Sequence, residues 1–164
     1  MGTQDLDGSR WRPLRLLQQS MDDDVASLYD RAGITGVRTR FVGPLIQLAQ
    51  HDSMTIQELA TSVEVTHSAM SQTVAAMRRS DLVEPAEDTD GRTRRVRLSE
   101  RGRELLPFLR AEWRATEATI RDLEAEIPYP LSQVVTDIHA ALARRSFRAR
   151  LDANLRKALA GRLR

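Results

Sequence analysis

The segment from residue 55 to residue 102 constrains the fold most, because its residue pattern changes from helical to extended in a fixed order. Two stretches with helical spacing come first, TIQELA and THSAMSQTVAAMRR, and a turn at residues 62–65 joins them. Residues 82–85 and 92–99 follow with the two-residue period of strands, separated by the turn sequence DTDG. This order predicts a winged helix-turn-helix, in which a two-helix unit is followed by a β hairpin.

Both predicted helices begin with a recognisable N-terminal cap. In the first, the Thr55 hydroxyl can accept a hydrogen bond from the amide of Glu58, whose carboxylate can return to the amide of Thr55. In the second, over residues 66–79, Thr66 is the expected N-cap. The spacing of the apolar residues then predicts which side chains are buried in the two helices: Ile56, Leu59, Ala60, Met70, Val74 and Met77.

The opposite face of the second helix is polar and suits contact with DNA. Gln72 can make a bidentate contact to adenine, and the two serines of this face can bond a base edge or a phosphate. His67, at the helix start, could contact phosphate, contact guanine or act as a cap. Taken alone, this face fits a solvated surface as well as it fits a DNA contact. The residues expected to meet DNA from this helix are Thr66, His67, Ser68, Ser71, Gln72 and Arg79.

The predicted hairpin carries arginine both at its tip and on its outer face. The strand period turns Val96 and Leu98 inward and the arginines between them outward. Packing gives little reason for arginine at these positions, whereas phosphate contact and insertion into a narrow minor groove explain it. The residues expected to contact DNA from the hairpin are Arg92, Arg94, Arg95 and Arg97, with Asp90 close enough in sequence to orient Arg92.

The charge of the chain is strongly segregated, although the net charge is only +2. Residues 92–103 hold six arginines against one acidic residue, and residues 144–164 hold eight basic residues against one. Local charge of this kind attracts phosphate even where the average charge is small. The basic C-terminal stretch also carries interleaved Phe147, Leu151, Leu155 and Leu159, which favours a dimer helix with a charged outer side.

Helices are predicted on both sides of the winged segment, so the fold class is mainly α with a small β wing. One helix runs from about residue 13 to Gly33, and a second follows with a kink expected at Gly43-Pro44. Ser99 is the expected N-cap of a long helix that reaches about Ile127. A last helical stretch begins at residue 131 and is interrupted near Ser146.

The long helix needs a surface that the winged segment alone does not supply. Nearly 30 residues of helix extend roughly 40 Å at 1.5 Å per residue. Pairing of residues 13–32 and 104–163 with the same segments of a second chain provides that surface and predicts a homodimer. The expected organisation is a flexible N-terminus (1–12), N-terminal dimerisation and support helices (13–52), a winged helix-turn-helix DNA-binding domain (53–102) and C-terminal dimerisation helices (103–164).

These residues resemble the MarR family of bacterial transcription regulators over nearly the whole chain. The resemblance is carried by residues 55–60 and 66–77, by Leu82-Val83, and most specifically by Asp90-Gly91-Arg92 followed by residues 96–99 and Gly102. It implies a homodimer that binds a pseudo-palindromic operator in double-stranded DNA, usually as a repressor and often released by a small-molecule effector. It also implies that Arg92 enters the minor groove.

Four positions depart from the family pattern. Glu64 and Asp81 stand where glycine is frequent, which is acceptable provided that the backbone there is not strongly left-handed. Ser68 replaces a frequent proline and Gln72 a frequent arginine. The last two leave the operator sequence open.

An enzyme is the weaker interpretation, and no cofactor or metal is expected. The three histidines are far apart in sequence and lack metal-ligand spacing, and the chain has no cysteine. The serious alternative is a winged-helix protein-protein interaction module without DNA binding, and the arginine-rich hairpin argues against it. No apolar stretch predicts a signal peptide or a membrane span, so a cytoplasmic protein is expected.

The sequence identifies no effector. A cleft between the dimer helices and the winged segment could be lined by aromatic residues, yet each of these is more often an ordinary core or interface residue. The four aromatic residues concerned are Trp11, Tyr29, Phe41 and Trp113.

Overall fold

The computed structural model describes residues 9–86 and 95–160. The predictions made for Asp90, Arg92 and Arg94 therefore lie outside the described residues. The chain divides into two compact units, Met1–Trp113 and Arg114–Arg164, and the long helix α6 contributes to both.

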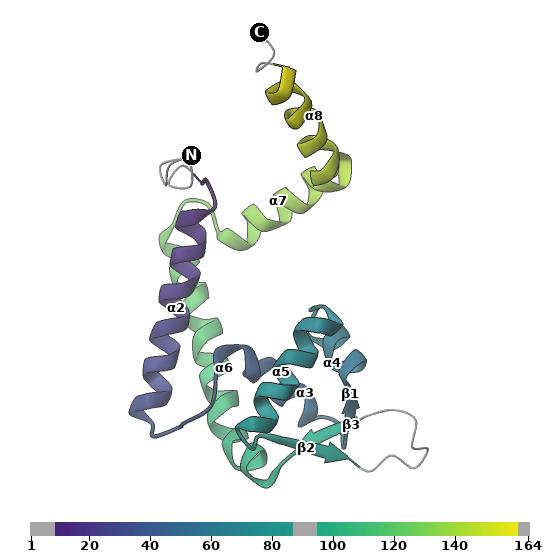
Figure 1. The fold of residues 1–164 in the computed structure, drawn as a ribbon. Helices are drawn as coiled ribbons and strands as arrows, with labels where there is room; N and C mark the ends of the chain where they lie inside the picture. The colour runs from purple at the N-terminus through teal and green to yellow at the C-terminus, as the bar shows by residue number, and fades with distance from the viewer. Residues whose placement is uncertain (1–8, 87–94, 161–164) are drawn as a thin grey trace, which may run out of the picture. The chain divides into compact units, whose positions relative to one another are not determined.

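Helices make up most of the described chain, with a small sheet between them (Figure 1). The first unit contains α2, α3 and the described elements of the winged segment, and the second contains the remainder of α6 and two further helices. In chain order the elements are α2 (Arg12–Arg31), α3 (Thr39–Leu48), β1 (Met54–Thr55), α4 (Ile56–Ser62), α5 (His67–Arg79), β2 (Val83–Ala86), β3 (Arg95–Leu98), α6 (Glu100–Glu126), α7 (Leu131–Arg144) and α8 (Phe147–Ala160).

The core of the first unit lies where α3, α4 and α5 meet the sheet. The predicted inward faces are confirmed for α5, whose Met70, Val74 and Met77 are buried, and for Leu59 and Ala60 of α4. Ile56, which the spacing also placed inside, is only partly buried. The mainly α fold class with a small β wing is confirmed.

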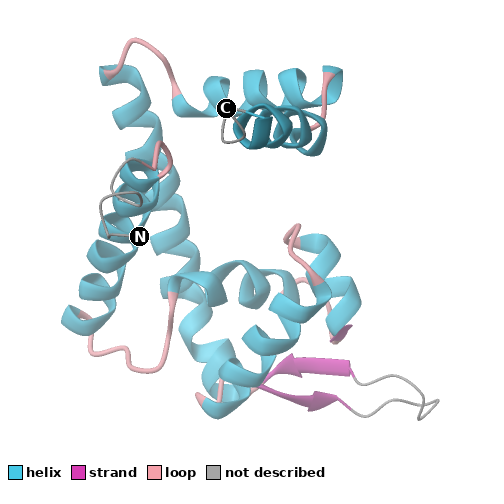
Figure 2. Ribbon diagram, turned by 45° about the horizontal axis from the view of Figure 1, so that its top comes forward, coloured by secondary structure: helices cyan, strands magenta, loops and turns pink. Residues whose placement is uncertain are grey.

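The sheet has three antiparallel strands among the described residues, in the order β1, β3, β2 (magenta in Figure 2). Val83 lies opposite Leu98 and Met54 opposite Val96, so β3 is the central strand. Val96 and Leu98 are buried as the strand period predicted. The sequence predicted the pairing of β2 with β3, whereas it did not predict β1 as a third strand.

Two turns take a backbone conformation that the sequence did not predict. Glu64 and Asp81 both have φ near 56°, in the left-handed region, so the condition under which these residues would replace glycine without strain is not met. Each residue follows the C-cap of a helix. The backbone hydrogen bonds Val65 N to Ala60 O and Leu82 N to Met77 O, both 3.0 Å, close the helix ends in the Schellman pattern. These bonds fix the turn although the side chain is not glycine.

Replacing Glu64 with glycine should stabilise the protein by about 0.5 to 1 kcal/mol, because glycine adopts a left-handed conformation without steric conflict. Urea unfolding followed by circular dichroism would measure the change. Ala75→Gly is the matched control, since Ala75 is an exposed residue in the middle of α5, and it should instead destabilise by about 1 kcal/mol. A loss of stability in Glu64→Gly as large as in the control would contradict the argument.

The first helix, α2, is attached to α6 by a buried polar contact. The Tyr29 hydroxyl donates to the Glu112 carboxylate over 3.1 Å, and both residues are buried. The tyrosine ring also lies 6.2 Å from the ring of Phe108, between centroids. Tyr29 and Phe41 are thus core residues, whereas Trp11 and Trp113 are exposed, so the four aromatic residues proposed for a ligand cleft do not share one environment.

This contact predicts a loss of stability at alkaline pH. Burial, and then the charge and hydrogen bond of Glu112, raise the pKa of Tyr29 above its usual value of about 10. A raised folded-state pKa means that the stabilising contribution is present below pH 10 and is lost as the pH rises beyond that value. Urea unfolding at increasing pH should therefore show a steeper decline above pH 10 in the wild type than in Tyr29→Phe. Equal slopes would contradict the prediction.

The second unit consists of helices whose apolar side chains are largely exposed. The helix break predicted near Ser146 is confirmed, since the Ser146 hydroxyl accepts from the amide of Ala149 and Arg150 donates to the carbonyls of Ala141 and Arg145. No described residue of α7 or α8 is buried. Within the described ranges, no helix is both long and apolar enough to cross a membrane. The large exposed hydrophobic residues of this unit are Leu123, Ile127, Tyr129, Leu131, Val134, Val135, Phe147, Leu151, Leu155 and Leu159.

Candidate nucleic-acid interface

Helix α5 presents the polar face that the sequence predicted. The Thr66 hydroxyl accepts from the amide of Ala69 over 3.2 Å, which confirms the N-cap. His67, Ser68, Gln72 and Arg79 are exposed, and Ser71 is half-buried. The exposed residues thus lie on the side of α5 opposite its buried apolar residues. Ala69 and Ala75 are exposed as well.

The side chain of Gln72 forms no hydrogen bond or ion pair within residues 9–86 and 95–160. The same holds for the hydroxyls of Ser68 and Ser71. Their hydrogen-bonding groups are therefore available to water or to a bound molecule. In the described part of the chain, no group of histidine, aspartate and glutamate residues could hold a metal ion.

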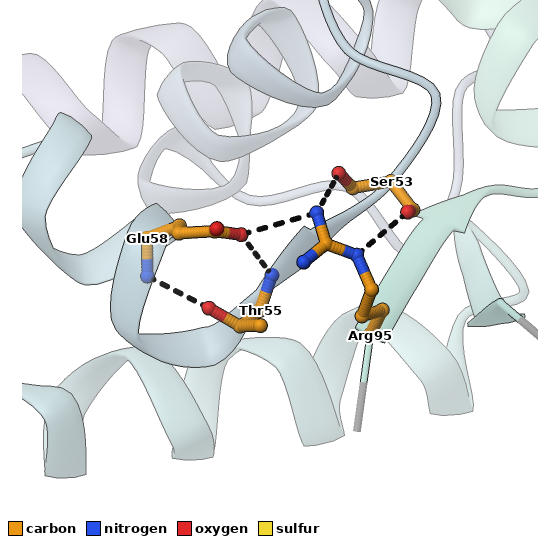
Figure 3. Close-up of polar contacts among 4 residues, drawn as sticks. All are labelled: Ser53, Thr55, Glu58 and Arg95. Carbon is orange, nitrogen blue, oxygen red and sulfur yellow. Dashed lines mark hydrogen bonds and ion pairs between the residues drawn. The ribbon is translucent and has the colours of Figure 1, made fainter. Parts of the chain in front are cut away.

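The start of α4 is fixed by a capping box and by an arginine from the sheet (Figure 3). The Thr55 amide donates to the Glu58 carboxylate over 2.7 Å, and the Glu58 amide donates to the Thr55 hydroxyl over 3.1 Å. Arg95 approaches the same carboxylate, with 3.3 Å between its Nη2 and Glu58 Oε2. The backbone hydrogen bond from Thr55 lowers the pKa of Glu58, and the guanidinium of Arg95 lowers it further.

Arg95 is also hydrogen-bonded to the segment just before α4. Its Nε donates to the Ser53 hydroxyl over 2.9 Å and its Nη2 donates to the Ser53 carbonyl over 2.7 Å. Arg97, on the same strand, pairs with Glu84 across the sheet over 2.7 Å. The expectation that the outward arginines of this strand lack a packing reason is therefore wrong. Contact between these two arginines and DNA remains a prediction.

The segment that follows α5 is joined to the start of α6 by the side chain of Ser99 and by a close approach of the backbone. The Ser99 hydroxyl donates to the Asp81 carbonyl over 2.6 Å and accepts from the Gly102 amide over 3.0 Å, which confirms Ser99 as the N-cap of α6. A Cβ added at Gly102 would lie 2.1 Å from the carbonyl oxygen of Leu82. Only glycine therefore fits where the two helices meet.

A second arginine of this region has a structural role that the sequence did not indicate. Arg101 donates to the carbonyl of Ser80, at the end of α5, and to the carbonyl of Thr35, in the loop after α2. The partners are backbone carbonyls more than 20 residues away in sequence, so no local pattern could have identified them. The positive charge of Arg101 thus serves, at least in part, to hold three segments of the first unit together.

A family model described as a winged helix DNA-binding domain matches residues 41–102. The chain has the fold of MarR family regulators. The structure of the M. tuberculosis transcriptional regulator MosR in complex with DNA aligns with a TM-score of 0.60 and 20% identity, over 84% of this chain and 98% of that one. A comparison of this chain with curated proteins found no match.

Two further structures with the MarR fold align at similar quality. The S. aureus MepR–DNA complex has a TM-score of 0.59 at 15% identity and covers 84% of this chain and 97% of that one. The Streptomyces coelicolor regulator PcaV, in complex with its natural ligand, has a TM-score of 0.57 at 18% identity and covers 89% and 99%. The alignments therefore include the flanking helices as well as the winged domain.

Gly102→Ala should destabilise the protein by about 3 kcal/mol or prevent folding, because the new methyl group would overlap the Leu82 carbonyl and force the backbone to shift. Thermal and urea unfolding would measure the effect. Gly43→Ala is the matched control. There the added Cβ meets only Val63 Cγ1 at an ordinary 3.6 Å, so stability should stay level or rise by up to about 1 kcal/mol. A well-folded Gly102→Ala variant with unchanged stability would contradict the close approach.

Proposed function

We propose that the protein is a sequence-specific regulator of transcription that binds double-stranded DNA as a homodimer and acts as a repressor at a pseudo-palindromic operator. The observation that carries the proposal is the exposed polar face of α5. This face belongs to a winged helix DNA-binding domain, and its hydrogen-bonding side chains have no intramolecular partner among the described residues. In a winged helix-turn-helix, the second helix is the element that enters the major groove.

The proposed DNA contacts divide into base readout and backbone contact. Exposed residues of α5 are proposed to face the bases, because the N-terminal part of a recognition helix reaches base edges. Arg92 and Arg94 are proposed, from the sequence, to meet the backbone or minor groove, with Asp90 orienting Arg92. Arg95 and Arg97 are the weaker candidates, because both have intramolecular carboxylate partners. The solved structures of MosR and MepR in complex with DNA support this general mode of action.

The homodimer is proposed from the exposed apolar side chains of the terminal helices. No described residue of α7 or α8 is buried, although these helices carry large hydrophobic residues at helical spacing. Exposed apolar surface on this scale marks an interface in a folded protein. A second copy of the chain is the simplest partner, because closed two-fold symmetry is the commonest way in which chains of one kind assemble.

Release by a small molecule is proposed as the means of regulation. PcaV, which shares the fold, is described in complex with its natural ligand. The residues of this chain do not identify the ligand.

Arg92→Ala should weaken operator binding and reduce its dependence on salt, because one arginine-phosphate contact contributes roughly 0.9 to the slope of log K against log salt. Fluorescence anisotropy with an operator duplex, repeated over a salt series, would measure both. Arg110→Ala is the matched control, because Arg110 is an exposed arginine of α6, and it should leave affinity and slope unchanged. If the wild type binds no duplex in a random-sequence selection, the protein-protein interaction module becomes the better interpretation.

The homodimer should appear in light scattering as a particle of twice the 18.5 kDa chain mass at micromolar concentration. Leu151→Glu should shift the protein towards monomer, because it places a charge on the exposed apolar side of α8. Arg156→Glu is the control, because Arg156 is also exposed on α8 but lies on a different side of the helix from Leu151. The protein with this substitution should remain dimeric. A wild-type protein that is monomeric under these conditions would rule out the dimer.

A further inference from the structure

We propose that the base pair facing the centre of α5 in each half-site is an A·T pair, read by Gln72 through adenine and by neighbouring alanine methyl groups through thymine. This inference rests on the proposed function and names the chemistry of the DNA that the interface recognises. It follows from the side chains that α5 exposes and from the absence of lysine and arginine in most of the helix.

The first part of the argument is the amide of Gln72. The side chain is exposed, and within the described chain it has no intramolecular hydrogen bond, so both its carbonyl and its amino group are free. An amide presents one acceptor and one donor side by side, which matches the N6 donor and N7 acceptor that adenine displays in the major groove. Guanine displays two acceptors at the same edge, so it offers no donor to the carbonyl of a glutamine amide.

The second part is the small apolar surface around that amide. Ala69 and Ala75 lie three residues before and three residues after Gln72, and both are exposed. Residues three apart are neighbours on a helix surface. Two methyl groups therefore flank the amide, and apolar groups contact the C5-methyl of thymine favourably. Their small size also lets the helix approach the floor of the groove closely.

The third part is the position of the basic residues. The stretch from His67 to Met77 contains no lysine or arginine, and the arginines of α5 are confined to its last turn, at Arg78 and Arg79. Bidentate recognition of guanine, the commonest specific contact to that base, needs a lysine or arginine. The part of α5 that enters the groove first therefore lacks the usual means of selecting a G·C pair. His67 can supply a single hydrogen bond there, and it is tested separately below.

The inference is tested by selecting binding sites from a random-sequence duplex library with the wild type and with three variants. The wild type should enrich an A·T pair at one position of each half-site. Gln72→Ala should lose the preference at that position only, and Gln72→Arg should enrich G·C there instead. His67→Ala should keep the A·T preference at that position. Gln72 is exposed, so thermal unfolding of its variants should match the wild type.

Modified duplexes test the same contact atom by atom. Replacing the selected adenine with 7-deazaadenine removes the N7 acceptor and should weaken wild-type binding about tenfold, while binding by Gln72→Ala should not change. Replacing the thymines at this position with uracil removes the methyl group and should weaken binding by a smaller factor. A motif that is unchanged in Gln72→Arg, or that holds G·C at the position controlled by residue 72, would overturn the inference. If the wild type enriches no motif at all, the proposed function itself fails.

Discussion

The contact between Gly102 and the carbonyl of Leu82 is the constraint on which the arrangement of the winged domain depends. Because a Cβ at residue 102 would lie 2.1 Å from that oxygen, the first turn of α6 lies directly against the backbone that follows α5. The Ser99 hydroxyl completes the junction by bonding Asp81 on one side and Gly102 on the other. The end of α5, the beginning of β2 and the start of α6 therefore meet at one point, where a close backbone approach and the side chains of Ser99 and Arg101 together fix the end of the recognition helix.

Arg95 has the corresponding role at the opposite end of the sheet, and it changes how the charge of the chain should be interpreted. Its guanidinium joins β3 to Ser53 and Glu58, while Arg97 on the same strand is paired with Glu84. Exposed ion pairs of this kind are worth about 1 kcal/mol or less in stability, but they offset positive charge that a count along the sequence would assign to phosphate binding. The number of arginines in residues 92–103 therefore overstates the positive charge available to phosphate, because Arg95 and Arg97 are already paired with carboxylates.

The separation along the sequence between interacting residues decided which contacts could be predicted. The caps at Thr55, Thr66 and Ser99 involve partners three residues away, and the buried face of α5 follows from helical spacing, so all of these were predicted. The partners of Arg95 lie at least 37 residues away in sequence, and those of Arg101 at least 21. These contacts form only when strand pairing and helix packing bring the segments together. The left-handed turns at Glu64 and Asp81 were missed because residue preference pointed elsewhere, whereas the hydrogen bonds that close each helix determine the conformation.

A helix fixed at both ends suits recognition by short side chains. The Thr66 hydroxyl caps the start of α5, and the Gly102 junction lies just after its end. The exposed residues of its first turns include Ser68 and Ala69, which lose little conformational freedom on binding. Among these turns, Gln72 carries the longest flexible side chain, and ordering it costs up to about 2 kcal/mol. A bidentate contact contributes a comparable amount of discrimination, about 1 to 3 kcal/mol. Selectivity at this position therefore depends on how well the rigid helix places one amide, which is why the backbone junctions matter for function as well as for folding.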